Sequence, residues 1–320
     1  MNAALPEQVD RRRRGLAAVL GGGAVAASLS GCAVLVRNGP AGPVLEFDDP
    51  AFVPPPPNVA RPVALVLSGG SARGFAHLGM LRVLEREGLR PDLIVGTSAG
   101  AIVGAMSASG MKVRQMEALA EQLDWSVVLD FEPIQALFNG FGLGPVPGHR
   151  LERFLRAHIR QPIERFAVPF AAVAADMNNG DIVPLTHGDA ARAVRASCAV
   201  PGIYAPVRVR ERLLGDGQIV SPLPVSTARA LGARRVLAFD VVYPPHHSEI
   251  TSPISMLFQS LIVSGWRHVL AERQQADLVI TPEIRTTTQL GLGSRDWLIE
   301  AGERAALSRV AEIRNLFATA

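Results

Sequence analysis

The chain has 320 residues, of which 48% are hydrophobic, and residues 61–320 alone are enough to form one large core. The formal net charge is +3, but residues 1–31 supply +2 of it through four arginines and two acids, so we expect no nucleic-acid binding. Two cysteines exclude a disulfide framework, and because no metal-ligand set is visible we predict no metal and no cofactor.

The N-terminus has the pattern of an export signal. Arg11–Arg14 precede a charge-free apolar run, Gly15–Ser30, which is short for a membrane span and suits a signal-peptide core over residues 1–31. The run ends in Leu29-Ser30-Gly31-Cys32, which resembles a bacterial lipobox and implies lipidation of Cys32. We therefore expect a lipid-anchored protein of the bacterial cell envelope, and Ala33 favours the outer membrane, facing the periplasm. The alternative is an uncleaved anchor with an unmodified cysteine.

Residues 32–60 follow as a tether. They show no helical or strand period and include the polyproline run Pro54–Pro57, which is typical of an extended spacer. We expect a folded core over residues 61–245, with a C-terminal strand and helices, residues 246–320, packed on it.

The core opens with a strand, a glycine-rich turn and a helix. Residues 63–67 are continuously apolar, as in a strand buried on both faces, and lead into Ser68-Gly69-Gly70-Ser71-Ala72-Arg73-Gly74. The helix that follows carries Phe75, Leu78, Leu81 and Leu84 on one stripe. The turn suits an oxyanion hole better than a phosphate cradle, because no Lys-Ser/Thr pair follows its last glycine.

A second strand, over 92–96, leads into Gly96-Thr97-Ser98-Ala99-Gly100 and then a helix. This G-x-S-x-G sequence between a strand and a helix predicts a nucleophile elbow, with Gly96 and Gly100 allowing the sharp turn that leaves the serine hydroxyl clear. The simpler interpretation is a turn in which Ser98 only caps the helix.

Further strands are expected over 169–174, 235–242 and 277–281, with helices over 188–198 and 226–231 between them. This alternation predicts an α/β fold with a mostly parallel central sheet flanked by helices. Asn178-Asn179-Gly180, between Asp176 and Asp181, favours a tight hairpin over a metal or acid–base site.

Two stretches have the composition of lipid-contacting segments. Residues 133–148 are rich in glycine and proline yet apolar, which fits a flap over the serine, although packing under the sheet is the simpler interpretation. Residues 256–263, ending near Trp266 and Arg267, fit an interfacial helix or a surface helix with its apolar stripe on the core.

Four stretches in order resemble the bacterial patatin-like phospholipase family. They are residues 69–74, residues 96–100, Arg195-Ala196-Ser197-Cys198-Ala199-Val200-Pro201-Gly202, and Asp216-Gly217. The resemblance implies a three-layer patatin-like fold and a Ser–Asp dyad, with Ser98 as nucleophile and Asp216 as base. It also implies an oxyanion hole from the backbone of the glycine-rich turn, namely Gly69, Gly70, Ser71, Ala72, Arg73 and Gly74. Three residues depart from the family pattern. Ser71 stands where members often have glycine, and the other two are Gln218 and Ser221.

A Ser-His-Asp triad is the rival within the same chemistry. Asp216 precedes His246, His247 and His268, which is the order of an α/β-hydrolase. Ser98, however, follows what we expect to be only the second strand of the core, earlier than that fold usually places its nucleophile. Order and context therefore favour the dyad.

The sequence thus predicts a serine acyl-ester hydrolase of phospholipids or lysophospholipids, held at a membrane by its lipid anchor. Two alternatives stay open. One is an acyltransferase of similar layout, although Thr97 stands where such enzymes usually carry histidine. The other is a non-catalytic lipid-binding lipoprotein of the envelope. The sequence identifies no protein partner.

Overall fold

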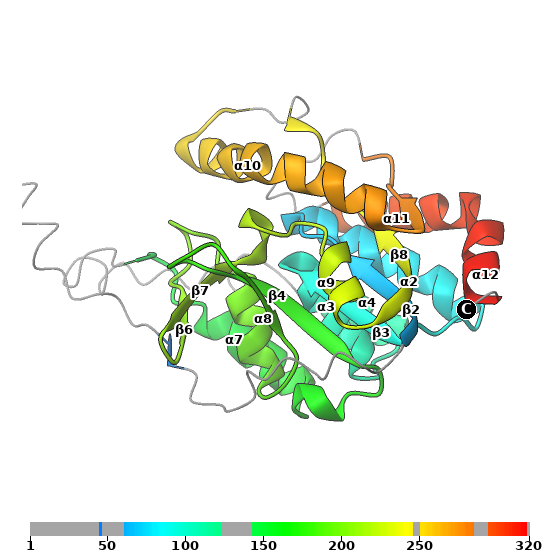
Figure 1. The fold of residues 1–320 in the computed structure, drawn as a ribbon, viewed down its shortest axis with the longest axis horizontal. Coiled ribbons are helices and arrows are strands. Elements are labelled where there is room, and N and C mark those ends of the chain that lie inside the picture. The colour runs from blue at the N-terminus through cyan, green and yellow to red at the C-terminus, as the bar shows by residue number, and fades with distance from the viewer. Residues whose placement is uncertain (1–44, 47–60, 123–142, 246–249, 285–293, 319–320) are drawn as a thin grey trace, which may run out of the picture.

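The structure is a computed structural model that describes residues 45–46, 61–122, 143–245, 250–284 and 294–318 (Figure 1). These residues form a nine-stranded sheet in the order β1-β6-β7-β4-β3-β2-β8-β9, with β5 pairing with β4. The pairs β1–β6, β2–β3, β3–β4, β2–β8 and β8–β9 are parallel, whereas β4–β5, β4–β7 and β6–β7 are antiparallel. The predicted α/β fold with a mostly parallel sheet is confirmed.

The strands are β1 (Leu45–Glu46), β2 (Arg61–Leu67), β3 (Leu93–Thr97), β4 (Phe170–Asp176), β5 (Ile182–Leu185), β6 (Val207–Val209), β7 (Arg212–Asp216), β8 (Ala233–Phe239) and β9 (Leu278–Ile280). The α-helices are α2 (Ala76–Arg86), α3 (Ala99–Ala108), α4 (Val113–Gln122), α7 (His149–His158), α8 (Ala190–Ser197), α9 (Val225–Ala230), α10 (Pro253–Gln275), α11 (Arg295–Ser308) and α12 (Val310–Ala318). Three 3₁₀ turns are η1 (Ser71–Phe75), η2 (Ile163–Arg165) and η3 (Gly217–Ile219).

Helices cover both faces of the sheet, which is why its central strands are apolar without alternation. In β2, Leu65 and Leu67 face the larger core, which includes residues of α2, α3, α8 and α11. Ala64 and Val66 face the smaller core beneath α9. All four side chains are completely buried. The continuous apolar run of β2 therefore reflects a three-layer architecture.

The structure corrects some predicted bounds and adds elements. The strand expected over 235–242 is β8, which ends at Phe239, because the next residues turn toward the glycine-rich segment, where Val241 N donates to Ser68 Oγ at 2.8 Å. The hairpin expected at Asn178–Gly180 joins β4 to β5, with Gly180 at φ 80°. The short strands β5, β6 and β7 were not predicted, because runs of three to five residues carry little periodicity. β1 lies inside residues 32–60, which we expected to have no strand; residues 45–46 instead pair with β6, a contact that no local pattern shows.

The C-terminal part joins the same sheet and the same core. β9 pairs with β8, and α11 packs against α2. α10 lies between β8 and β9 in the chain. It starts at a capping box in which Ser252 Oγ accepts from Ser255 N, and Pro253 occupies its first turn. α10 runs along one side of the molecule, across the top of Figure 1. It is much longer than the helix expected over 256–263, so Trp266 and Arg267 lie within it.

Candidate active site

Ser98 lies at the sharp turn between β3 and α3. Its backbone has φ 52° and ψ −120°, a conformation that non-glycine residues rarely adopt and that costs free energy. Its side chain makes no capping bond to α3. Instead Ser98 Oγ donates to Asp216 Oδ2 at 2.8 Å. The interpretation of Ser98 as a simple helix cap is therefore wrong.

Gly96 and Gly100 serve this turn in a different way from the one expected. Neither has a positive φ, so Ser98 itself carries the unusual conformation. A Cβ on Gly96 would lie 2.4 Å from Gly100 O, and a Cβ on Gly100 would lie 2.2 Å from Leu67 O. The two glycines are needed because backbone segments of β2, β3 and α3 touch at this point.

The sheet register explains how two residues 118 positions apart meet. β4 pairs with β5 along one edge over residues 172–175. Along its other edge, β3 ends with Thr97 opposite Val173, and β7, running the opposite way, ends with Asp216 opposite Ala174. β3 and β7 therefore point toward one another along β4. The residue after β3 and the last residue of β7 meet where the strands stop.

Asp216 is buried, with 1% of its surface exposed. Its Oδ1 accepts from Gln218 N at 2.8 Å, while Oδ2 accepts from Ser98 Oγ. Burial raises the pKa of its carboxyl from 3.8 to about 7, and the bonds from Gln218 and Ser98 oppose that rise. A carboxylate with a pKa near neutrality is suited to accept a proton from a serine hydroxyl.

The described histidines lie apart from this pair. Among the described residues, no histidine hydrogen-bonds to Ser98 or Asp216. His77 is completely buried and lies 2.9 Å from Ser68 O through Nε2, and burial lowers its pKa to about 4. His268 is exposed on α10. Of the triad candidates, residues 246 and 247 lie outside the described residues.

The glycine-rich turn lies beside Ser98, and only part of its backbone is available to an anion. Gly69 N donates to Pro222 O at 2.9 Å, and Arg73 N donates to Gly70 O at 3.1 Å. The N–H groups of residues 70, 71 and 72, at the start of η1, make no hydrogen bond within the described residues. Of residues 69–74, which we expect to form the oxyanion hole, these three are the ones whose backbone N–H groups stay available to an anion. Ser71 has φ 51°, which explains why glycine suits this position.

Arg73 ties this turn to the segment after β8. Its guanidinium is buried, donates through Nε to Val241 O at 2.9 Å, and lies 5.6 Å from the ring centroid of Tyr243. Burial lowers its pKa to about 10, so it stays charged at neutral pH. The side chain is thus an anchor for the turn.

Sequence reasoning missed the role of Ser197. Ser98 N donates to Ser197 Oγ at 2.9 Å, and Ser197 Oγ donates to Val173 O at 2.6 Å. This hydroxyl holds the backbone of Ser98 in its turn, and it occupies an N–H that would otherwise be a candidate oxyanion donor. The neighbouring Cys198 is buried, as expected of a small core residue, and burial raises the pKa of its thiol. The one feature of the sequence that could have pointed to Ser197 is its place in the Arg195–Gly202 motif.

A small cavity of about 20 Å³ lies above Ser98. One wall is formed by the turn, the nucleophile and their neighbours: Gly70, Ser71, Arg73, Ser98, Val200, Asp216 and Gln218. The opposite wall is α10, through Phe258, Leu261 and Ile262. A cavity of this size holds about one water molecule, whereas ligand pockets measure hundreds of cubic ångströms.

Other predicted features lie apart from this cavity or outside the described residues. Within segment 133–148, residues 143–148 are described, and Val146 forms a bridge to Tyr204 while Pro147 O accepts from Arg195. This end of the segment packs on the chain after α8. Residue 32, the expected lipidation site, lies outside the described residues. The described residues contain no group of three or more metal-ligating side chains and no helix long and apolar enough to cross a membrane.

Comparison with known proteins identifies the family. Residues 65–229 match the family described as Patatin-like phospholipase. An NTE family protein of Mycobacterium tuberculosis is 36% identical over 180 residues, which cover 55% of this chain and 48% of that protein. Patatin-like phospholipase domain-containing protein 7 of Rattus norvegicus is 34% identical over 190 residues, covering 56% and 13%. The chain thus spans half or less of the length of these relatives.

Among solved structures, VipD from Legionella pneumophila aligns with a TM-score of 0.49 and 15% identity over 79% of this chain and 67% of that chain. The family match covers just over half of the 320 residues and contains both the Ser98 turn and Asp216. The chain therefore belongs to the patatin-like phospholipase family, and its matched domain is that of a carboxylic ester hydrolase.

Proposed function

We propose that the chain hydrolyses acyl esters of phospholipids or lysophospholipids with Ser98 as nucleophile and Asp216 as general base. The observation that carries this proposal is the 2.8 Å bond from Ser98 Oγ to a buried carboxylate whose pKa is raised to about 7. A serine hydroxyl is a weak nucleophile until a neighbouring base accepts its proton. The bond places that base within reach.

The reaction then has two halves. Ser98 Oγ attacks the ester carbonyl carbon while its proton passes to Asp216, and the carbonyl oxygen becomes an oxyanion beside the N–H groups of residues 70–72. The C–O bond to the leaving alcohol breaks, and Asp216 returns the proton to that oxygen. In the second half, water attacks the acyl carbon and gives its proton to Asp216. The bond between Ser98 Oγ and the acyl carbon then breaks, the free acid leaves, and Asp216 returns the proton to Ser98 Oγ.

The test compares the full chain with Ser98→Ala and Asp216→Asn on p-nitrophenyl butyrate and on phospholipid vesicles. We expect each variant to lose at least about a thousandfold in kcat, because nucleophile and base act as one unit. His268→Ala, a change at an exposed residue, is the matched control and should keep full activity. Undiminished ester hydrolysis by Ser98→Ala would contradict the proposal.

Attachment to the envelope through Cys32 stays a prediction. It is supported by the lipobox-like sequence at the end of the apolar run. We expect the protein to fractionate with membranes, and Cys32→Ala or globomycin treatment to block processing. Release of the mature domain in the presence of globomycin would contradict this.

A further inference from the structure

A helix, α10, forms one wall of the candidate active site. Phe258 and Ile262 of α10 are buried against the cavity, and Leu261 is partly buried there. Ser98 is partly exposed, and the space of about 20 Å³ that the described residues leave beside it is smaller than an acyl chain needs. We therefore expect this part of α10 to move aside when a lipid ester binds.

The two halves of α10 are held differently. Near its C-terminal end, Arg273 Nε donates to the buried Asp240 Oδ2 at 2.6 Å, and Glu272 accepts from both Ser226 N and Ser226 Oγ at 2.6 and 2.5 Å. The N-terminal half of α10 covers the cavity. Among the described residues, its side chains make one hydrogen bond to a residue outside the helix and the two residues before it, which Gln259 Nε2 donates to Pro245 O at 2.7 Å. The covering half rests mainly on apolar contacts and is the easier part to displace.

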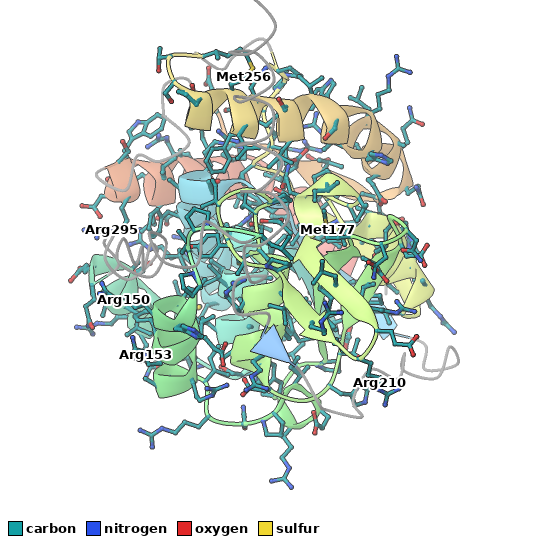
Figure 2. All side chains as sticks on the ribbon, turned by 90° about the vertical axis from the view of Figure 1, so that its left-hand side faces the viewer. Arg150, Arg153, Met177, Arg210, Met256 and Arg295 are labelled. Atoms are coloured by element: carbon teal, nitrogen blue, oxygen red, sulfur yellow. The ribbon has the colours of Figure 1, made fainter. Side chains whose placement is uncertain are left out.

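The outer face of α10 carries a second apolar stripe. Met256, Val263 and Leu270 are 51%, 54% and 44% exposed and follow one another at intervals of seven residues, so they lie along one line of the helix. Figure 2 shows Met256 near the top edge of the molecule, on the helix that covers the site. The exposed residues Ser260 and Arg267 lie between them, so this outer face combines apolar and polar side chains. Apolar side chains exposed along one line of a helix are a candidate contact surface.

The charges of α10 indicate what binds this surface. Arg267 and His268 are exposed, whereas the one carboxylate of the helix, Glu272, is buried against α9. The exposed side chains of α10 thus combine an apolar stripe with positive charge and no negative charge. This is the composition of helices that lie in the interface of an anionic bilayer.

We propose that α10 is a membrane-docking lid: the stripe of Met256, Val263 and Leu270, with Arg267 beside it, binds an anionic lipid bilayer, and docking displaces the covering half of the helix from Ser98. The inference rests on the proposed lipid hydrolase function, because a bilayer then supplies both the docking surface and the substrate. The anchored C-terminal half remains on the core while the covering half moves.

The test uses the chain from residue 33 onward, which keeps every described residue and lacks both the expected signal segment and the expected lipidation site. It measures binding to vesicles of phosphatidylglycerol and phosphatidylcholine in equal parts. The variant Met256→Ser/Val263→Ser/Leu270→Ser should bind about tenfold more weakly or worse, because three apolar side chains no longer enter the bilayer. Trp297→Ser/Leu307→Ser on α11, each 38% exposed in the native chain, is the matched control and should bind normally. Arg267→Glu should weaken binding to these vesicles and not to pure phosphatidylcholine.

Opening of the site is measured with vesicles of ether-linked phosphatidylglycerol, which has no ester to cleave. We expect these vesicles to raise the rate of p-nitrophenyl butyrate hydrolysis several-fold in the protein with the unaltered stripe. The triple serine variant should show no such increase. Equal vesicle binding by the triple variant would overturn the docking surface, and absence of stimulation would overturn the lid. A wild-type dimer that dissociates in the triple variant would show that a second copy covers the stripe instead.

These measurements test the hydrolase proposal and the docking proposal independently. Ser98→Ala should lose ester hydrolysis and keep vesicle binding. If the wild type cleaves no ester yet binds vesicles through the stripe, the hydrolase proposal fails and the docking surface stands.

Discussion

Replacing Asp216 by asparagine should abolish activity and stabilise the protein. The carboxylate is buried, its pKa is raised to about 7 chiefly by that burial, and it accepts only from Ser98 and Gln218 among the described residues. Ionising it in the folded state is therefore costly, and we interpret that cost as the consequence of burying a proton acceptor beside a serine. Asparagine keeps the shape and has no charge to bury.

The sign follows from the two pKa values. The folded protein keeps a proton on Asp216 up to about pH 7, whereas the unfolded chain loses it near 3.8, so the free energy of unfolding falls as the pH rises between these values. With about 1.4 kcal/mol per pKa unit, the cost reaches roughly 4 kcal/mol above pH 7. At pH 4.5 it is only about 1 kcal/mol.

Urea and thermal unfolding of wild type and Asp216→Asn at pH 4.5 and pH 8 measure this difference. We expect the advantage of the variant to grow by about 3 kcal/mol between the two pH values, which corresponds to roughly 6–10 °C in Tm. Asp181→Asn, at an exposed carboxylate in the β4–β5 hairpin, controls for the loss of one charge. If the stability advantage of Asp216→Asn does not grow with pH, the reasoning is refuted. The wild-type kcat/KM gives a second test: it should increase with pH up to about 7, as Asp216 loses its proton. A kcat/KM that is already constant above pH 5 would also refute the reasoning.

Four further substitutions test the backbone of the site by urea unfolding and ester hydrolysis. Ser71→Gly should raise the free energy of unfolding by about 0.5 kcal/mol, because φ 51° strains a serine; a loss of stability would contradict this. Gly100→Ala should prevent folding or inactivate the protein, since its Cβ would lie 2.2 Å from the backbone oxygen of Leu67. Gly69→Ala should have a milder effect, because its Cβ would meet the side chain of Gln218, which can move. Equal losses of stability and activity in the two variants would contradict this distinction. Ser197→Ala should cost about 1–3 kcal/mol and lower kcat by leaving Ser98 N without its acceptor; an unchanged protein would show that water replaces the hydroxyl.

Much of the fold could be predicted because its central strands are buried on both faces. The strands ending at Leu67 and Thr97 have continuous apolar runs, and the glycine-rich turns that follow them are local features of the chain. Strands β5 to β7 and the length of α10 could not be predicted in this way. The short strands are stabilised by pairing with distant neighbours, and α10 is apolar on two faces, so its periodicity is weak.

The residues of the site could be found in the sequence: a serine at a strand-to-helix turn, a second turn rich in glycine, and an aspartate before glycine. The contact between Ser98 and Asp216 depends on the tertiary structure, because β3 and β7 end against each other along one edge of β4. The tertiary structure also decided the raised pKa of Asp216, since burial depends on what the rest of the chain packs around it. The cover of α10 over the cavity likewise arises from contacts between segments about 160 residues apart, which no local pattern contains.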